Sequence, residues 1–364
     1  MGRARGAVPA RGAVPLLRRP DVHDAGVRRV AGCRHGRLHA RVHHDGLGLN
    51  IVVGYAGLLD LGYVAFYAVG AYLFALLASP QLLDTFPAIK EAMPNGMHSS
   101  IWLVIPCGAA LAGFFGVLLG APTLKLRGDY LAIVTLGFGE IIRVFLLNLD
   151  APVNITNGPK GIGPIDSPTI FGWHLGRSSN VFGFDIPPVT HYYYVLLGLV
   201  LFGLLICYRL ERSRIGRAWM AIREDEIAAK AMGINTRNMK LLAFGMGATF
   251  GGVSGVMFAT FQGFVSPESF ALQESVIIVA MVVLGGIGHL PGVIVGALLL
   301  AALPEVLRYV ASPVQQLTGG RLDASILRQL LVALAMITIM LIRPRGLWPS
   351  PEHGKAAPAP AAAK

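Results

Sequence analysis

Charged residues are scarce in this chain of 364 residues. They make up 14% of the sequence, whereas a soluble domain contains about 25%. Hydrophobic residues account for 54%, and the mean hydropathy is +0.59. This composition excludes an ordinary soluble protein. A membrane-spanning helix needs roughly 20 apolar residues, so there is room for about eight spans. We therefore predict an all-α integral membrane protein with several spans.

The chain also lacks the motifs of catalysis and metal binding. It has three cysteines, with no CxxC pair and no His/Cys cluster at zinc spacing, so neither a disulfide framework nor a metal site is predicted. No phosphate-binding loop GxxxxGK[ST], no GxSxG elbow and no HExxH occurs. We therefore expect no catalytic residue, no cofactor bound by this chain, and no ATP hydrolysis by this chain.

The basic excess is concentrated at the start of the sequence. Residues 1–46 hold 10 Arg and 3 Asp, so +7 of the net charge of +11 lies there. This arm has no Lys, Ser or Thr and no apolar core typical of a secretory signal. It is either a disordered basic arm or DNA translated out of frame, and we favour the second interpretation. Retranslating the upstream DNA tests it. A membrane domain is predicted over 47–348 and a disordered Pro- and Ala-rich tail over 349–364.

Seven apolar regions stand out after the arm, and two of them are interrupted. The sixth is broken by a cluster of helix-breaking residues, Gly285, Gly286, Gly288 and Pro291. The first is too long for one span and is predicted to break near Asp60. Irregular backbone at membrane depth is tolerated only where protein or a water-filled cavity covers it. We therefore expect broken or re-entrant helices. The regions are 47–79, 101–119, 130–149, 192–208, 241–261, 275–303 and 325–342.

Loop charge predicts the orientation. Residues 209–240 carry eight Lys and Arg, which places this loop in the cytoplasm. The loop over 150–191 holds only Lys160 and Arg177 and is expected outside. The C-terminus is then cytoplasmic if the sixth region crosses twice or dips in and returns.

Three of the polar residues inside the apolar regions are candidate site residues. Glu140 and Arg143 are three residues apart, hence on one helix face. Each alone would cost about 2.5–3.5 kcal/mol at the bilayer centre. They either line or gate a solute route, or form a structural pair. Asp60 is either a pathway or hinge carboxylate or a turn residue, and we favour the turn.

Glycines recur at every fourth position in the fifth region, at Gly247, Gly251 and Gly255. This spacing makes a smooth face that another helix can approach closely. The face is either a subunit interface or a packing face within the chain, and we favour packing within the chain.

The cytoplasmic loop contains a predicted helix from Glu224 to Met232. Glu224, Asp225 and Glu226 lie at its N-terminal end, where acidic residues favour the helix dipole, and Gly233 follows where a glycine typically ends a helix. Such a helix either docks on a soluble partner or lies on the lipid headgroups.

Several separated stretches resemble one transporter family. Ala228, Ala229 and Gly233 are similar to the Glu-Ala-Ala-xxx-Gly coupling motif of ABC-importer permeases, with Ile227 in place of the Glu. More specifically, the chain resembles LivM-type permease subunits of branched-chain amino acid importers. The matching stretches are 49–59, 126–137, 156–162, 214–234 and 284–288. The arm over 1–46 departs from the family, which has an apolar helix there, and so does Asp60, where a small polar residue is expected.

The resemblance implies a heteromeric importer in the bacterial inner membrane. Its partners would be a second permease subunit, two ATP-binding subunits that hold ATP and Mg, and an extracytoplasmic binding protein. The helix ending at Gly233 would dock on the ATPase. Two alternatives remain open: a permease for urea or short amides, and an ion-coupled secondary transporter that uses Glu140 and Arg143.

Overall fold

The structure is a computed structural model. It describes residues 44–348 except 93–99, 125, 127, 171–172, 175, 177–178, 182–183, 318–323 and 344–345. Most of the predicted basic arm and the whole predicted tail therefore lie outside the described residues. Residues 44–46, which we assigned to the arm, are helical, and His44 and Asp45 are buried.

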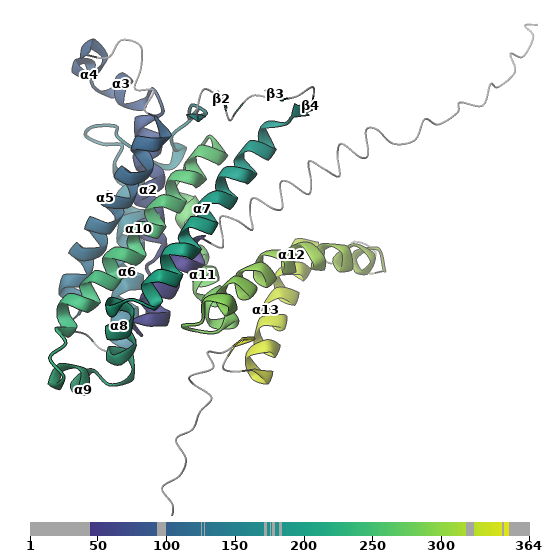
Figure 1. The fold of residues 1–364 in the computed structure, drawn as a ribbon. Helices are drawn as coiled ribbons and strands as arrows, with labels where there is room; N and C mark the ends of the chain where they lie inside the picture. The colour runs from purple at the N-terminus through teal and green to yellow at the C-terminus, as the bar shows by residue number, and fades with distance from the viewer. Residues whose placement is uncertain are drawn as a thin grey trace, which may run out of the picture.

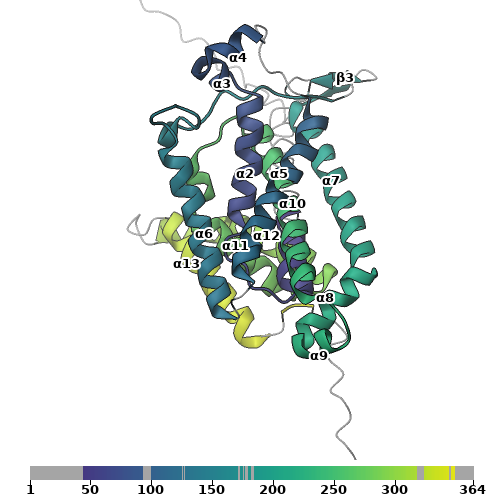
Figure 2. The ribbon, with the colours of Figure 1, turned by 90° about the vertical axis from the view of Figure 1, so that its left-hand side faces the viewer.

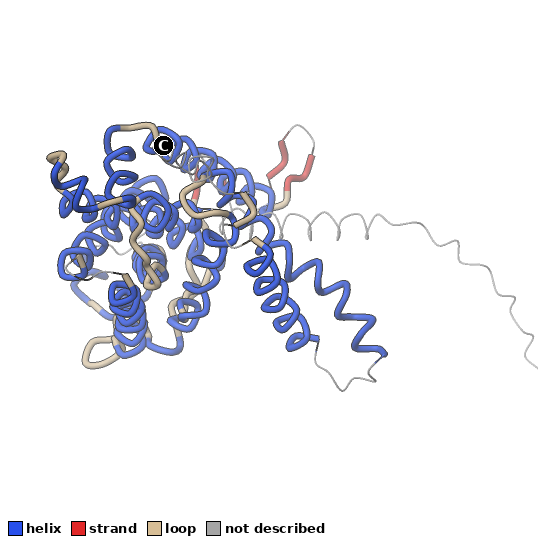
Figure 3. Tube along the Cα trace, turned by 90° about the horizontal axis from the view of Figure 1, so that it is seen from below, coloured by secondary structure: helices blue, strands red, loops and turns tan. Residues whose placement is uncertain are grey.

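The described chain is helical, as predicted, with two short hairpins (Figures 1 and 3). Its longer helices are α2 (Val64–Leu77), α5 (Ile101–Thr123), α6 (Asp129–Asn148), α7 (Pro188–Glu211), α8 (Arg214–Glu224), α10 (Thr236–Gln262), α11 (Leu272–Gly285), α12 (Leu290–Leu317) and α13 (Ala324–Ile342). The short ones are the π-helix η1 (Asn50–Tyr55), α3 (Gln81–Thr85), α4 (Pro87–Ala92), η2 (Gly158–Lys160), α9 (Glu226–Ala231) and η3 (Pro267–Phe270). The antiparallel hairpins pair β1 (Thr169–Ile170) with β2 (Trp173–His174) and β3 (Ser179–Val181) with β4 (Phe184–Ile186).

Five helices in the described part are long and apolar enough to cross a membrane. The spans are Ile101–Thr123, Asp129–Asn148, Thr190–Glu211, Thr236–Gln262 and Pro267–Gly285. Shorter apolar helices cover Val64–Leu77 and Leu290–Pro304. The upright helices α2, α5, α6, α7 and α10 run side by side, while α12 and α13 are inclined to them (Figures 1 and 2). This arrangement confirms the predicted all-α membrane fold.

The two ends of the upright helices carry different structures. Helices α8 and α9 lie at one end, and α3, α4 and the hairpins lie at the other (Figures 1 and 2). The hairpins belong to the segment 150–191, which we predicted as an external loop. Helix α12 is longer than expected: the predicted region ended at Leu303, before Pro304, but the helix runs to Leu317.

Helix α10 is the centre of the bundle. Of its apolar stretch, 72% is buried inside the protein, against 22% for α6. It packs mainly on α5 and α2, and glycines bring the backbones together. A Cβ atom on Gly255 would collide with Tyr67 O of α2, and one on Gly252 would lie 2.5 Å from Gly108 O of α5. Small residues at such contacts gain dispersion energy because the helices approach closely.

The other predicted packing glycines face the same chain. A Cβ atom on Gly247 would collide with the Val52 side chain of η1, and one on Gly251 would lie 3.0 Å from the Phe66 side chain of α2. In this structure, therefore, Gly247, Gly251 and Gly255 all pack within the subunit.

We predict that Gly255→Ala destabilises the protein by about 1–3 kcal/mol, because the added methyl group overpacks the contact with α2. The control is Gly198→Ala on α7, where nothing lies within 4 Å of the new Cβ position. Thermal unfolding of the two variants in detergent compares them. An unchanged midpoint for Gly255→Ala would contradict this packing.

Candidate functional site

The loop that joins α7 to α10 contains two helices. Each helix follows an N-capping residue. For α8, Ser213 Oγ accepts a hydrogen bond from Gly216 N at 3.1 Å. For α9, Asp225 Oδ1 accepts hydrogen bonds from Ile227 N at 2.8 Å and from Ala228 N at 3.1 Å. Such caps satisfy backbone N–H groups that have no partner within the helix. The loop is thus built from defined helices.

The predicted single helix from Glu224 to Met232 is interrupted at Asp225. This residue has an extended backbone (φ −151°, ψ 110°) because it caps α9, so α9 starts at Glu226, and Glu224 is the last residue of α8. Helix α8 was not predicted from the sequence, although its hydrophobic period and the capping residue Ser213 indicate it.

Helix α9 presents apolar side chains to its surroundings. Ile227 is 73% exposed and Met232 83%, and Ala228 is also exposed, whereas Ala229 is buried. Exposed apolar side chains of this size suit contact with another protein or with a membrane surface. Ile227, which departs from the Glu-Ala-Ala motif, is one of these exposed residues.

Gly233 ends α9 as the sequence predicted. Its φ is +83°, and its N–H donates to Lys230 O at 3.0 Å. Nothing lies within 4 Å of the position that a Cβ atom would take. The constraint at this position is therefore the left-handed backbone alone, which favours glycine.

An ion pair ties α9 to α10. Glu226 Oε2 lies 2.8 Å from Lys240 Nζ, and Glu226 Oε1 lies 3.4 Å from Lys230 Nζ. The hydrogen bond from Lys240 holds the pKa of the Glu226 carboxyl below its usual range. Glu226 therefore faces inward, toward α10. A second bond fixes α8, where the buried Trp219 Nε1 donates to Met239 O at 2.7 Å.

The second helix break meets η1 beside α8. Arg223 Nη1 donates to Gly54 O of η1 at 2.5 Å, and Gly288 N donates to Asn50 Oδ1 of η1 at 3.1 Å. Gly286 and Gly288 have φ of +124° and +80°. The π-helical winding of η1 is a form often found at functional sites. The glycine cluster located the second break, but nothing in the sequence pattern indicated its bond to η1.

The second break is closed by the C-terminal segment. Leu347 N donates to Leu284 O at 2.8 Å and Trp348 N to Gly285 O at 3.1 Å. Pro291 is the second residue of α12, within the first turn, where its missing N–H is not needed. The cluster of Gly285, Gly286, Gly288 and Pro291 thus forms the turn between α11 and α12.

Asp60 lies in the first break and is 1% exposed. Its Oδ1 accepts a hydrogen bond from Gly62 N at 2.9 Å, and the next N–H, that of Leu61, donates to Thr135 Oγ1 of α6 at 3.0 Å. Asp60 therefore occupies the turn that leads into α2, the role we favoured from sequence.

Glu140 and Arg143 form a pair on α6. Arg143 Nε donates to the two carboxylate oxygens of Glu140 at 2.9 and 3.0 Å. The side chains remain 43% and 26% exposed, respectively. Among the described residues no hydrogen bond or ion pair connects them to Asp60 or to the α8–α9 loop. They form a separate feature on an open helix face.

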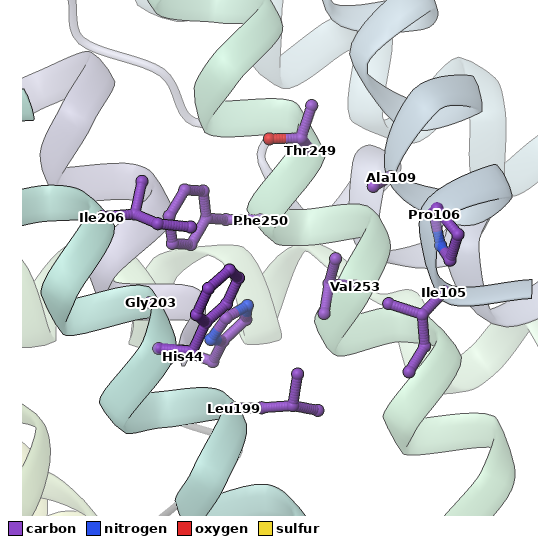
Figure 4. A pocket seen from close by; sticks show the side chains of 11 residues that line it. His44, Ile105, Pro106, Ala109, Leu199, Gly203, Ile206, Thr249, Phe250 and Val253 are labelled. Carbon is purple, nitrogen blue, oxygen red and sulfur yellow. The ribbon is translucent and has the colours of Figure 1, made fainter. Parts of the chain in front are cut away.

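An apolar cavity of about 260 Å³ lies between α5, α7 and α10 (Figure 4). His44 and Thr249 are its polar lining side chains, and the His44 ring lies beside that of Phe250, with centroids 5.1 Å apart. No charged side chain lines it, so it offers nothing to hold a charged solute.

Known proteins resemble this chain over most of its length. The model of a family described as branched-chain amino acid transport system / permease component matches residues 46–341. The high-affinity branched-chain amino acid transport system permease protein LivM of Escherichia coli (strain K12) is 44% identical over 84% of this chain and 67% of its own length. LivM of Salmonella typhimurium (strain LT2) is 43% identical over the same shares. The permease protein LivH of Salmonella typhimurium is 26% identical over 85% of this chain and 91% of its own length. No solved structure matches.

We predict that Glu226→Gln lowers the free energy of unfolding at neutral pH and that this difference from wild type vanishes at acidic pH. The pKa of Glu226 is lowered in the folded state. The contribution of the ionised Glu226 to stability is therefore fully present above the ordinary Glu pKa of about 4.3. It is lost as the pH falls through the lower pKa that Glu226 has in the folded protein.

A contribution of about 0.2–1 kcal/mol is expected for a partly exposed pair. Unfolding midpoints at neutral and acidic pH measure it, and Glu224→Gln, at an exposed residue that forms no ion pair in the described part, is the control. A pH-independent difference between Glu226→Gln and wild type would contradict the assignment.

Proposed function

Because the chain belongs to the branched-chain amino acid transport system permease family, we propose that it is the membrane subunit through which an ATP-driven importer passes leucine, isoleucine and valine. It is a transport subunit and not an enzyme. The observation that carries the proposal is the capped α9 helix, which presents Ile227 and Met232 outward at one end of a multi-pass membrane protein.

The proposed transporter contains several different chains. LivM and LivH are both named as permease proteins of the high-affinity system, and both are similar to this chain. We therefore infer a second, related permease subunit beside this one. Two ATP-binding subunits would hold ATP and Mg and complete the motor, and an extracytoplasmic binding protein would deliver the solute. Placing ATP hydrolysis in separate subunits is consistent with the lack of a phosphate-binding loop in this sequence.

Coupling would begin at the surface of α9. The helix is fixed at its start by the Asp225 cap and by the Glu226–Lys240 pair, so a partner that moves it moves α10 as well. Arg223 of α8 is bonded to Gly54 of η1, and this bond connects the same loop to the broken helices. A rigid element bound at an interface transmits rigid-body motion.

The proposed orientation places the α8–α9 loop and the C-terminus in the cytoplasm of a bacterium, with this chain in its inner membrane. Two features support it. The loop over 209–240 carries eight Lys and Arg, as expected for a cytoplasmic loop. Trp348, near the end of the chain, is hydrogen bonded to Gly285 at the second break, which lies beside α8.

We expect ATP-dependent uptake of leucine, isoleucine and valine by the complete transporter in proteoliposomes, with binding protein supplied. Urea, the substrate of the closest alternative, should not be taken up. The measurement is accumulation of each radiolabelled solute with and without ATP. ATP-dependent urea uptake without amino acid uptake would overturn the proposed substrate class, and uptake driven by an ion gradient without ATP would overturn the proposed mechanism.

We predict that Gly233→Val lowers the amount of solute moved per ATP hydrolysed. A β-branched residue is strained at φ +83°, by roughly 1–2 kcal/mol, and the turn that holds α9 against its partner would relax. Gly233→Asn is the matched control, because asparagine tolerates this backbone. Transport and ATP hydrolysis are measured in the same proteoliposomes. Wild-type stoichiometry for Gly233→Val would contradict the coupling role of this turn.

A further inference from the structure

A second cavity, of about 230 Å³, lies at the base of the α8–α9 loop. We call it the Arg223 cavity. It is enclosed by the segment after η1, by the start of α6 and by α8, α9 and α10. Gly57, Leu59 and Gly128 at its rim are exposed, so the cavity is open to the side on which the loop lies. This space is large enough for a molecule the size of a small amino acid.

One wall of the Arg223 cavity is positively charged. Arg223 is half-buried and donates to Gly54 O, which leaves other N–H groups of its guanidinium available. In the described part of the chain no carboxylate forms an ion pair with Arg223. Lys240 and Glu226 line the cavity as a pair. Two cations therefore face one carboxylate, and a buried charge of this kind favours an anionic partner.

The guanidinium is held in place by the backbone beside it. A Cβ atom on Gly57 would lie 2.8 Å from Cγ of Arg223, so the arginine stem packs directly on this glycine. Burial lowers the pKa of the Arg223 guanidinium, which is the cost of keeping an unpaired cation out of water. A carboxylate in the cavity would offset that cost with a bidentate pair.

The rest of the lining is largely aliphatic. It includes Leu58, Leu126, Leu131 and Ile222, of which Leu58, Leu131 and Ile222 are buried. A ligand that matches this lining has a carboxylate and a branched hydrocarbon. The carboxylate of Glu226 adds a place for an ammonium group.

We propose that the Arg223 cavity binds a branched-chain amino acid from the cytoplasm, with its carboxylate on Arg223, its ammonium on Glu226 and its side chain on the leucines. The inference rests on the proposed function, which supplies this solute on that side of the membrane. Bound there, the amino acid bridges η1, α8, α9 and α10 and holds the loop in one position. A ligand that binds one conformation shifts the population toward that conformation. Because the proposed transport cycle requires the loop to move, the transported solute inhibits the transporter that accumulates it.

The test uses the complete transporter in lipid nanodiscs, without the binding protein. Calorimetric titration with leucine, isovalerate and isoamylamine separates the contribution of the carboxylate from that of the amine. We expect heat of binding from leucine and from isovalerate, which has the carboxylate but no amine, and none from isoamylamine, which lacks the carboxylate. Binding of the amine alone, or no binding of leucine, would overturn the proposal.

Variants of the transporter then test whether leucine binds in the Arg223 cavity. Arg223→Gln should weaken leucine binding by about tenfold or more, because it removes a charge-assisted pair. Leu59→Trp fills the cavity from its exposed rim and leaves the guanidinium in place, and it should have the same effect. Arg217→Gln is the matched control, because Arg217 is exposed on the same helix and donates to Arg212 O. Unchanged leucine binding by Arg223→Gln and Leu59→Trp would place the ligand elsewhere and overturn the proposal.

The regulatory step is tested by ATP hydrolysis in the same nanodiscs. Leucine should lower the basal rate of wild type and of Arg217→Gln, and about tenfold more leucine should be needed to inhibit Leu59→Trp to the same extent. An ATPase rate that does not respond while leucine binds in the cavity would overturn the inhibition. Failure of uptake in proteoliposomes overturns the proposed function, whereas leucine binding that depends on Arg223 still supports the cavity.

Discussion

The structure depends on one constraint: backbone groups that a broken helix frees within an apolar body must find partners inside the protein. Both breaks meet it with partners distant in sequence. Arg223 donates to Gly54 O, and Asn50 accepts from Gly288 N. In the first break, Leu61 N reaches Thr135 of α6. Each of these bonds joins elements that otherwise belong to different parts of the bundle. Satisfying the breaks therefore also connects α8, η1 and the turn before α12 into one unit.

The same constraint explains how the loop acquires a fixed shape without a large core of its own. Helices α8 and α9 are short, and isolated helices of that length are marginal in water. Their positions come from the Ser213 and Asp225 caps and from Trp219, which is fully buried and bonded to Met239 O. What remains exposed on α9 includes the apolar side chain of Ile227 beside that of Lys230. The loop is thus a rigid surface attached directly to the membrane helices.

Much of this arrangement was predictable from the sequence, and the remainder has a common physical cause. Glycine and proline identify local backbone requirements, so the break after Gly285 and the end of α9 at Gly233 were located correctly. The apolar pattern of the sixth region ends at Leu303 and did not indicate that α12 continues past Pro304 to Leu317. The division at Asp225 was missed because three acidic residues follow one another there, and all of them suit the start of a helix. The role of Arg223 was not visible at all, since its partner Gly54 is a backbone carbonyl 169 residues away.

Helix α10 has a mechanical consequence. It begins in the loop at Thr236 and ends at Gln262, a length of about 40 Å at 1.5 Å per residue. Its closest contacts, at Gly252 and Gly255, lie about 20 Å from Lys240 along the axis. Close contacts also run along the rest of its length, since Phe244 and Ala248 lie against Gly116 of α5. A rod held along its length shifts as one body with the helices around it. A displacement imposed at the Lys240 end would therefore carry α2 and α5 with it.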